Sequence, residues 1–260
     1  MAEAMILRGG GTLSNPAGTI PPEPDLTTAL RWKFLADTLI PAGGTLATGA
    51  AIPSWPSSGQ GSNPITVNGN SDPARQPTFK NAAVNTHASV VFSAAATTYL
   101  RAGTMPGGTV LMPATMYAVA KILDSGTVLT GFGTPYLSIR GATYGRISAG
   151  AGNSTTELNS AGTADAPGPF ADGGFHIVIV VYNGANSAIY VDGRDPVTGN
   201  LGVPDTNAKL TGLGVGVGPG GNTAYLTGEI TEAGLYTRAL TANDAYALAA
   251  TLKTKYAIAF

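Results

Sequence analysis

The sequence contains no cysteine, two histidines and few charged residues, and each shortage excludes a class of function. Without cysteine there is no disulfide, no thiolate metal site and no thiol nucleophile. Charged residues make up 11% of the chain and the net charge is −1, so no basic field attracts a nucleic-acid backbone or an anionic membrane. No apolar run approaches the roughly 20 residues of a membrane helix. We therefore expect neither nucleic acid nor a membrane among the partners.

The first 25 residues are expected to form an extended arm rather than part of a packed domain. Three consecutive glycines at 9–11 and several prolines between 16 and 24 prevent regular helix and sheet. Met5, Ile6 and Leu7 would give the arm an apolar anchor on a partner, and a disordered tail is the alternative. The segment has no basic start of a signal peptide. We expect synthesis in a cytoplasm and a soluble chain, with release inside a virus particle as one route out.

Residues 26–260 carry the pattern of one all-β domain, in which short apolar segments alternate with turn-forming residues. Trp32 and Phe34 alternate with charged neighbours, which predicts a strand at 30–35; a short helix capped by Asp25 is the less favoured alternative. The unbroken apolar run at 175–182 predicts a central strand buried on both faces. Further strands are expected at 89–92, 115–122, 128–132, 187–192, 210–217 and 226–236. Such a series predicts a sandwich or a barrel.

Loops and one helix complete this pattern. Residues 41–80 are expected to form a long structured loop that buries Trp55 and Phe79, and residues 150–174 a second loop. Asp192 and Gly193 predict a type I′ turn. Thr241, with an acidic residue three positions later, begins a helix whose apolar residues recur at helical spacing up to Tyr256.

Four segments of the C-terminal third form a recognisable set. They read FHIVIVVYNG at 175–184, IYVDGR at 189–194, LGVGVG at 213–218 and GEITEAGLYTRALT at 228–241. Trp55, the VVF at 90–92 and the YL at 99–100 add a second set nearer the N-terminus. Together they resemble the laminin-G-like, concanavalin A-like domains of bacterial and bacteriophage proteins, over residues 26–256. The resemblance implies a two-sheet antiparallel jelly-roll sandwich with a C-terminal helix.

Acidic residues decide whether such a domain binds calcium or hydrolyses glycans. Where the family has Ile-Asp-Glu, this chain has Thr231 before Glu232, and we find no set of the six or more oxygen ligands that calcium needs. Glu229 and Glu232 are three positions apart, so on a regular strand they face opposite sides and form no glycosidase dyad. His87 and His176 provide neither a Ser-His-Asp set nor a two-histidine metal motif, and we expect a structural role for His176. We expect no enzyme, no catalytic residue, no metal and no cofactor.

Residues 135–149 predict a β-hairpin that turns near Gly141 and Ala142 and has one polar face. Leu137, Ile139 and Ile147 would point to the core. The opposite face would carry Tyr136, Ser138, Arg140, Tyr144, Arg146 and Ser148. Aromatic rings stack on sugar faces, and arginine offers planar donors for hydroxyls or acidic groups. The candidate carbohydrate- or partner-binding residues are therefore Tyr136, Arg140, Tyr144 and Arg146; an ordinary solvated sheet face is the alternative.

The arm, the missing cysteine, the low charge and the family resemblance together predict a non-enzymatic bacteriophage virion protein. It would be a minor tail, tail-tip or head-decoration protein, assembled in the host cytoplasm and located in the virion. The arm would bind other virion proteins, a homo-oligomer is expected, and the sandwich would bind cell-surface polysaccharide. The alternatives are a bacterial carbohydrate-binding module and a pure assembly or cement protein without a ligand.

Overall fold

The computed structural model describes residue 26 and residues 29–41, 44–58, 65–102, 112–123, 127–131, 137–142, 146–151, 157–159, 172–202, 211–218 and 221–259. The expected arm, with Met5, Ile6 and Leu7, lies outside the described residues, as do Tyr136 and Tyr144. Among the described residues, no helix combines the length and apolar character needed to cross a membrane.

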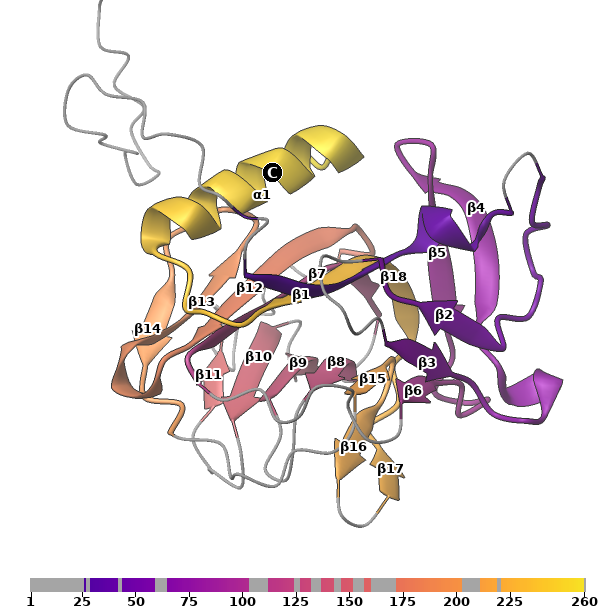
Figure 1. Cartoon of the computed structure of the whole chain (residues 1–260), viewed down its shortest axis with the longest axis horizontal. Coiled ribbons are helices and arrows are strands. Elements are labelled where there is room, and N and C mark those ends of the chain that lie inside the picture. The colour runs from indigo at the N-terminus through magenta and orange to yellow at the C-terminus, as the bar shows by residue number, and fades with distance from the viewer. Residues whose placement is uncertain are drawn as a thin grey trace, which may run out of the picture.

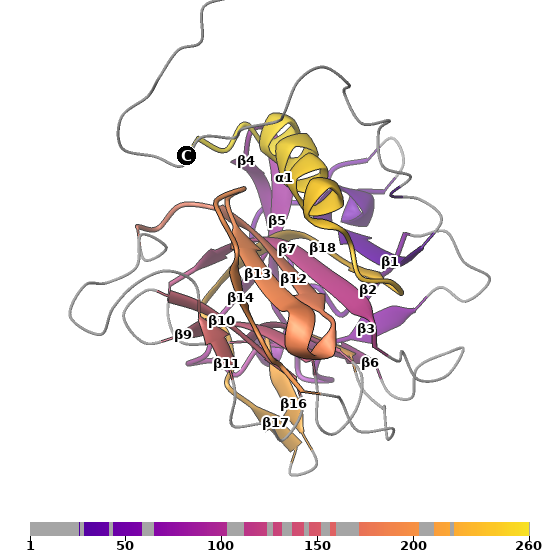
Figure 2. The same cartoon turned by 90° about the vertical axis from the view of Figure 1, so that its left-hand side faces the viewer.

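Within these residues the strands form two eight-stranded antiparallel sheets and a two-stranded ribbon, with one α-helix on the outer side of sheet A (Figures 1 and 2). Sheet A has the order β14-β13-β12-β7-β18-β5-β4, and β1 also pairs with β18. Its strands are β1 (Leu30–Leu35), β4 (Thr78–Val84), β5 (His87–Phe92), β7 (Ala114–Ile122), β12 (His176–Tyr182), β13 (Ser187–Val191), β14 (Val197–Gly199) and β18 (Gly228–Tyr236).

Sheet B has the order β11-β10-β9-β8-β15-β6-β3-β2. Its strands are β2 (Ser54–Pro56), β3 (Thr66–Asn68), β6 (Leu100–Ala102), β8 (Thr127–Gly131), β9 (Leu137–Ala142), β10 (Arg146–Ala151), β11 (Glu157–Asn159) and β15 (Thr211–Leu213). The remaining elements are the ribbon strands β16 (Gly216–Gly218) and β17 (Gly221–Thr223), the helix α1 (Ala242–Tyr256), and the short 3-10 helices η1 (Ala36–Leu39), η2 (Pro73–Arg75) and η5 (Gly184–Asn186). The predicted two-sheet antiparallel sandwich with a C-terminal helix is confirmed.

The central strands β12 and β7 of sheet A are buried on both faces, which explains why most of their residues are apolar. Along β12, Val178 and Val180 pack in the core between the sheets, whereas Ile177 and Ile179 pack under α1. The same alternation divides β7 between the inter-sheet core and the layer beneath the helix. Each fully buried aliphatic side chain stabilises the fold by about 1.5–3 kcal/mol.

Most strand predictions agree with this architecture. β1 alternates in burial as predicted, with Trp32 and Phe34 inside, so the alternative of a short helix there is wrong. Trp55 and Phe79 are fully buried as expected, but the predicted loop at 41–80 contains β2, β3, a 3-10 turn and the start of β4, so Trp55 and Phe79 both lie in strands. The predicted loop at 150–174 contains β11.

Two turns illustrate how backbone conformation limits the strands. Asp192 and Gly193 have φ values of +55° and +66°, as a type I′ turn requires. The predicted strand at 210–217 is interrupted, because Gly214 adopts φ +72° between β15 and β16. A positive φ departs from the extended conformation of a strand, so β15 ends at Leu213, although the N–H of Gly214 still donates to the carbonyl of Val128 at 2.9 Å.

Helix α1 begins as predicted. The Oγ1 of Thr241 accepts the backbone N–H of Asp244 at 3.2 Å, and Oδ2 of Asp244 accepts the N–H of Thr241 at 3.1 Å. This reciprocal capping satisfies two donors that the first helical turn leaves without partners. Leu248 and Leu252 then pack onto the outer face of sheet A.

Candidate functional site

The predicted hairpin exists as the antiparallel pair β9–β10. Gly141 and Ala142, which we expected in the turn, belong to β9, because the pairing continues through Ala142 opposite Arg146; the connection lies at residues 143–145. Ile139 stands opposite Ala149, which is fully buried in the inter-sheet core. Residues directly opposite each other share a face, and neighbours along a strand alternate. Positions 140, 146 and 148 therefore lie on the outer face of sheet B.

One row of positions crosses the outer face of sheet B from β3 to β10. Its members in register are Asn68, Arg101, Gly212, Thr130, Ser138 and Gly150. Arg101 is exposed, while its neighbours Leu100 and Ala102 are buried in the core. The residue types in this row are polar or glycine; Asn68 and Arg101 are exposed, Gly212 beside Arg101 is buried, and the hairpin positions lie on the same side of the sheet as Arg101.

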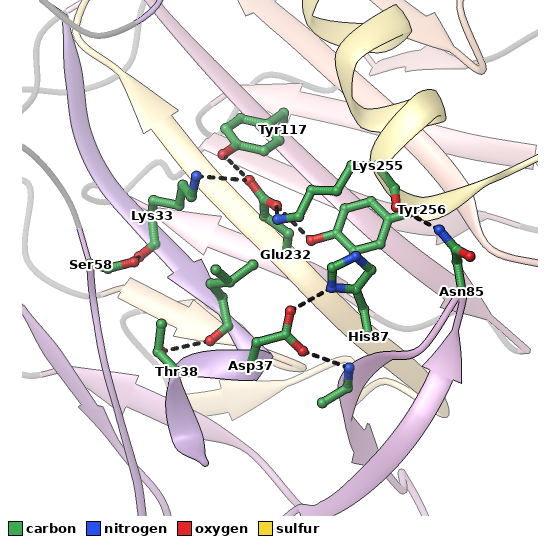
Figure 3. A network of polar contacts seen from close by, with 12 residues as sticks. Lys33, Asp37, Thr38, Ser58, Asn85, His87, Tyr117, Glu232, Lys255 and Tyr256 are labelled. Atoms are coloured by element: carbon green, nitrogen blue, oxygen red, sulfur yellow. Dashed lines mark hydrogen bonds and ion pairs between the residues drawn. The ribbon is translucent and has the colours of Figure 1, made fainter. Parts of the chain in front are cut away.

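A second polar group, centred on Glu232, lies on the outer face of sheet A beneath α1 (Figure 3). Glu232 is 2% exposed. Its Oε1 accepts the hydroxyl of Tyr117 at 2.8 Å, and its Oε2 accepts the hydroxyl of Tyr256 at 2.6 Å. The Nζ of Lys255 donates to Oε2 at 2.7 Å, and that of Lys33 lies 3.7 Å from Oε1. This group joins β1, β7 and β18 to the last turn of the helix.

The Glu232 carboxylate is held in its ionised form. Burial alone would raise its pKa, but the charges of Lys33 and Lys255, with the hydrogen bonds from Lys255 and Tyr256, outweigh burial and lower the pKa. Burial and the nearby carboxylate raise the pKa of Tyr117 and of Tyr256. A carboxylate that accepts from this many donors and stays ionised cannot serve as a general acid.

Glu229 has a similar environment three residues earlier on β18. Its Oε1 accepts from Lys80 Nζ at 2.8 Å and lies 3.8 Å from Lys121 Nζ. Its Oε2 accepts the hydroxyl of Ser89 at 2.8 Å. The side chain is buried among these partners, so its charge is balanced locally by lysines of neighbouring strands.

Our expectation that Glu229 and Glu232 face opposite sides is wrong. Opposite β7, the register of β18 shifts between Ile230 and Glu232, so Thr231 is the extra residue of a β-bulge. The bulge lies where β18 changes its second neighbour, from β5 beside residues 228–230 to β1 beside residues 232–236. Both glutamates therefore lie on the outer face of sheet A, one with Lys121 and the other with Tyr117.

The two histidines bind carboxylates near strand starts. His176 is buried, with Nδ1 2.8 Å from Asp192 Oδ2 and Nε2 3.1 Å from Asp172 Oδ1. Asp192 also accepts the N–H of Ile177 at 2.9 Å. His87 Nδ1 lies 2.6 Å from Asp37 Oδ2. These contacts agree with the structural role expected for His176, and no group of three His, Cys, Asp or Glu among the described residues could hold a metal.

The His176 site predicts a pH dependence of stability. Burial alone would lower the pKa of His176, but Asp192 and then Asp172 outweigh it, so the pKa is raised above 6.5. Both ring nitrogens face acceptor-only oxygens and so both must be protonated. The stabilisation is complete below pH 6.5 and is lost as the pH rises through the raised pKa. We expect the free energy of unfolding from urea titrations to fall by about 1 kcal/mol over this rise. The variant His176→Asn should lack this decline, and an equal decline in the variant would contradict the assignment.

Comparison with known proteins adds the family. A sequence profile of the concanavalin A-like lectin/glucanases superfamily matches residues 113–245, which is half of the chain. The chain belongs to this superfamily. Comparison with proteins of curated function gives no match.

Solved structures of a neurotoxin and of a sialidase are similar to this superfamily member. A structure of botulinum neurotoxin type C has 13% sequence identity to this chain and a TM-score of 0.51, over 78% of this chain and 51% of that chain. Cell entry of that toxin is described as dependent upon interaction with two ganglioside molecules. A Trypanosoma rangeli sialidase in complex with sialic acid has 16% identity and a TM-score of 0.45, over 88% of this chain and 33% of that chain. The chain thus spans between a third and about half of these proteins. At 13% identity, the likeness to the neurotoxin structure demonstrates the fold alone.

Proposed function

We propose that this chain is a non-catalytic, carbohydrate-binding protein of a bacteriophage virion, a minor tail, tail-tip or head-decoration component that binds cell-surface polysaccharide. The observation that carries the proposal is the register of sheet B, which puts Arg101 in one row with hairpin positions 138 and 150, on the same side of the sheet as positions 140 and 146. A polar sheet face with arginines suits a ligand rich in hydroxyls. Membership of a lectin-containing superfamily supports this reading.

The state of the two buried glutamates supports a non-catalytic role. A glycosidase needs one carboxyl group that donates a proton and a second that attacks or activates water. Glu232 is ionised and bound by two tyrosines and two lysines, and Glu229 by a serine and two lysines. In both cases the carboxylate oxygens accept hydrogen bonds from the protein itself. Both glutamates lie on the outer face of sheet A rather than on sheet B.

A virion role is supported by the sequence rather than by the fold. The chain has no cysteine, low charge and an arm in which Met5, Ile6 and Leu7 precede a run rich in glycine and proline. Such an arm would dock on neighbouring virion proteins, including further copies of this chain, while the sandwich stays available to a glycan. The location in the virion follows from that assembly.

Binding of the purified protein to cell envelopes of candidate host bacteria tests the proposal. We expect the double variant Arg140→Ala with Tyr144→Ala to lose at least about tenfold in affinity, since two ligand-contacting side chains are removed. Arg194→Ala, which removes an exposed arginine from a turn of sheet A, is the matched control and should bind like the native protein. A variant without residues 1–25 should keep envelope binding. Absence of binding by every form would refute the lectin role and favour a cement protein.

A further inference from the structure

The first described residues after the N-terminal arm lie on the α1 side of the sandwich. Leu26, Ala29 and Leu30 are half-buried and pack against the apolar cluster between α1 and sheet A. The backbone N–H and the hydroxyl of Thr237, directly after β18, both donate to the carbonyl of Ala29, at 2.9 and 3.4 Å. The arm therefore joins the domain beside the helix.

This junction and the outer face of sheet B lie on opposite sides of the sandwich. The cluster that Leu26 joins is on the outer side of sheet A, under α1, whereas the larger core fills the space between the two sheets. Figures 1 and 2 show α1 on one side of sheet A and sheet B on the other. A partner bound through the arm would therefore meet the α1 side and leave the outer face of sheet B uncovered.

The exposed residues of α1 carry no charge, which is unusual for the solvent side of a surface helix. Among the charged residues of the helix, Asp244 accepts from Arg238 and Lys255 donates to Glu232. The exposed residues are Ala242, Asn243, Ala250, Thr251 and Thr254. Both threonine hydroxyls donate to helix carbonyls one turn earlier, at 2.9 and 3.0 Å, so they are engaged within the helix. The outer surface of α1 thus suits contact with an apolar segment.

We propose that copies of this chain associate through the α1 side, with Met5, Ile6 and Leu7 of one copy lying on the exposed surface of α1 in the next. The three apolar side chains of the arm supply contact area, and the small residues of the helix allow the segment to approach closely. The inference rests on the proposed function, because it names the surface on which the arm docks during assembly. It leaves the outer face of sheet B available to a glycan.

The length and composition of the arm suit the helix of a neighbouring copy. The chain between Leu7 and Leu26 spans up to about 60 Å when extended, whereas the 15-residue helix is about 22 Å long. Prolines at 16, 21, 22 and 24 fix φ and favour an extended course, which would carry the apolar segment away from the helix of its own chain. Each copy offers one arm and one helix, so a reciprocal exchange between two copies satisfies both.

Sedimentation equilibrium of the full chain tests the association. We expect the variant Ala250→Arg to raise the dissociation constant at least about tenfold, because a charge would have to be buried in an apolar contact. Ala250 is exposed and arginine is a good helix former, so thermal unfolding should be unchanged. The combined variant Met5→Ser, Ile6→Ser and Leu7→Ser should weaken association to a similar extent. Ala74→Arg, at an exposed alanine of η2, is the matched control and should associate like the native protein.

Disulfide cross-linking tests the contact itself, because the native chain has no cysteine. A tagged chain that carries Leu7→Cys is mixed with an untagged chain that carries Ala250→Cys, and the mixture is oxidised. A disulfide requires Cα atoms within about 7 Å, so the mixed dimer should form in at least about tenfold greater yield than with a control chain that carries Ala74→Cys. Each chain has a single cysteine, so the mixed dimer reports contact between copies only.

A monomeric native protein would overturn the inference, as would unchanged association of Ala250→Arg or equal yields from the cysteines at 250 and 74. Cross-linking confined to a chain that carries both Leu7→Cys and Ala250→Cys would show that the arm folds onto its own helix, which also contradicts the proposal. These results differ from failure of the proposed function. Copies that associate and cross-link without binding envelopes leave the inference standing and refute the lectin role, whereas a monomer that binds envelopes does the reverse.

Discussion

Replacement of Glu232 by glutamine is expected to lower the free energy of unfolding by about 3 kcal/mol. The change keeps the shape of the side chain but removes the charge that Lys33 and Lys255 balance and that the hydroxyls of Tyr117 and Tyr256 donate to. Both hydroxyls are buried, so they cannot turn to water. Urea unfolding at pH 7 measures the loss, and an unchanged slope with denaturant would show that stability alone is altered.

The matched control for this variant is Asp195→Asn, which removes an exposed carboxylate and should change stability by less than about 0.5 kcal/mol. Glu229→Gln is a second variant for comparison with Glu232→Gln. Glu229 lies on the same face, and the residues that bind it, Lys80, Ser89 and Lys121, belong to strands of sheet A and not to the helix. We expect it to destabilise the protein without loosening α1. If Glu232→Gln were no more harmful than Asp195→Asn, the carboxylate would not be what holds α1 on the sheet.

The effect of Glu232 should also depend on pH, with a sign fixed by its lowered pKa. A carboxyl group with a folded-state pKa below its ordinary 4.5 contributes stability that is complete above pH 4.5 and is lost as the pH falls through the folded-state value. The difference between native protein and Glu232→Gln should therefore be largest at neutral pH and decrease in acid. This dependence is opposite to that of His176, whose contribution is lost on the alkaline side.

The Glu232 cluster could not be predicted from the sequence, whereas features that depend on neighbouring residues could. The all-β class, the central strand at 176–182 and the capping pair at the start of α1 depend on residues close together in the chain, and all three were predictable. The cluster gathers side chains from β1, β7, β18 and α1, and no local pattern connects them. The signal that was present is a pair of glutamates, Glu229 and Glu232, within a segment of strand-forming residues, because buried charges must find partners.

The β-bulge at Thr231 was beyond prediction for a related reason. Alternation along residues 228–236 gives no sign of an extra residue, because the bulge depends on which strands lie beside β18. One residue of shift reverses the face of every later side chain. The expected opposition of Glu229 and Glu232 failed for this reason alone. Their assignment as structural charges depends on the lysines found around each of them.

Gly214→Ala is expected to lower the free energy of unfolding by about 4 kcal/mol, through two separate effects. Gly214 has φ +72°, a conformation that any other L-residue adopts only with strain. A Cβ at this position would also overlap the ring of Phe92, which is buried in the core between the sheets. The ring has little room to withdraw, because protein cores are close-packed. Thermal or urea unfolding measures the total.

Two further variants separate these effects. Gly184→Ala introduces the same methyl group at φ +55° with no atom within 4 Å of the new Cβ, so it reports the backbone strain alone, about 1 kcal/mol. Combining Gly214→Ala with Phe92→Leu should recover the part due to the overlap and leave the strain, which a double-mutant cycle reports as a coupling of about 3 kcal/mol. A coupling near zero would mean that Phe92 moves away without penalty. The destabilisation by Gly214→Ala would then be due to backbone conformation alone.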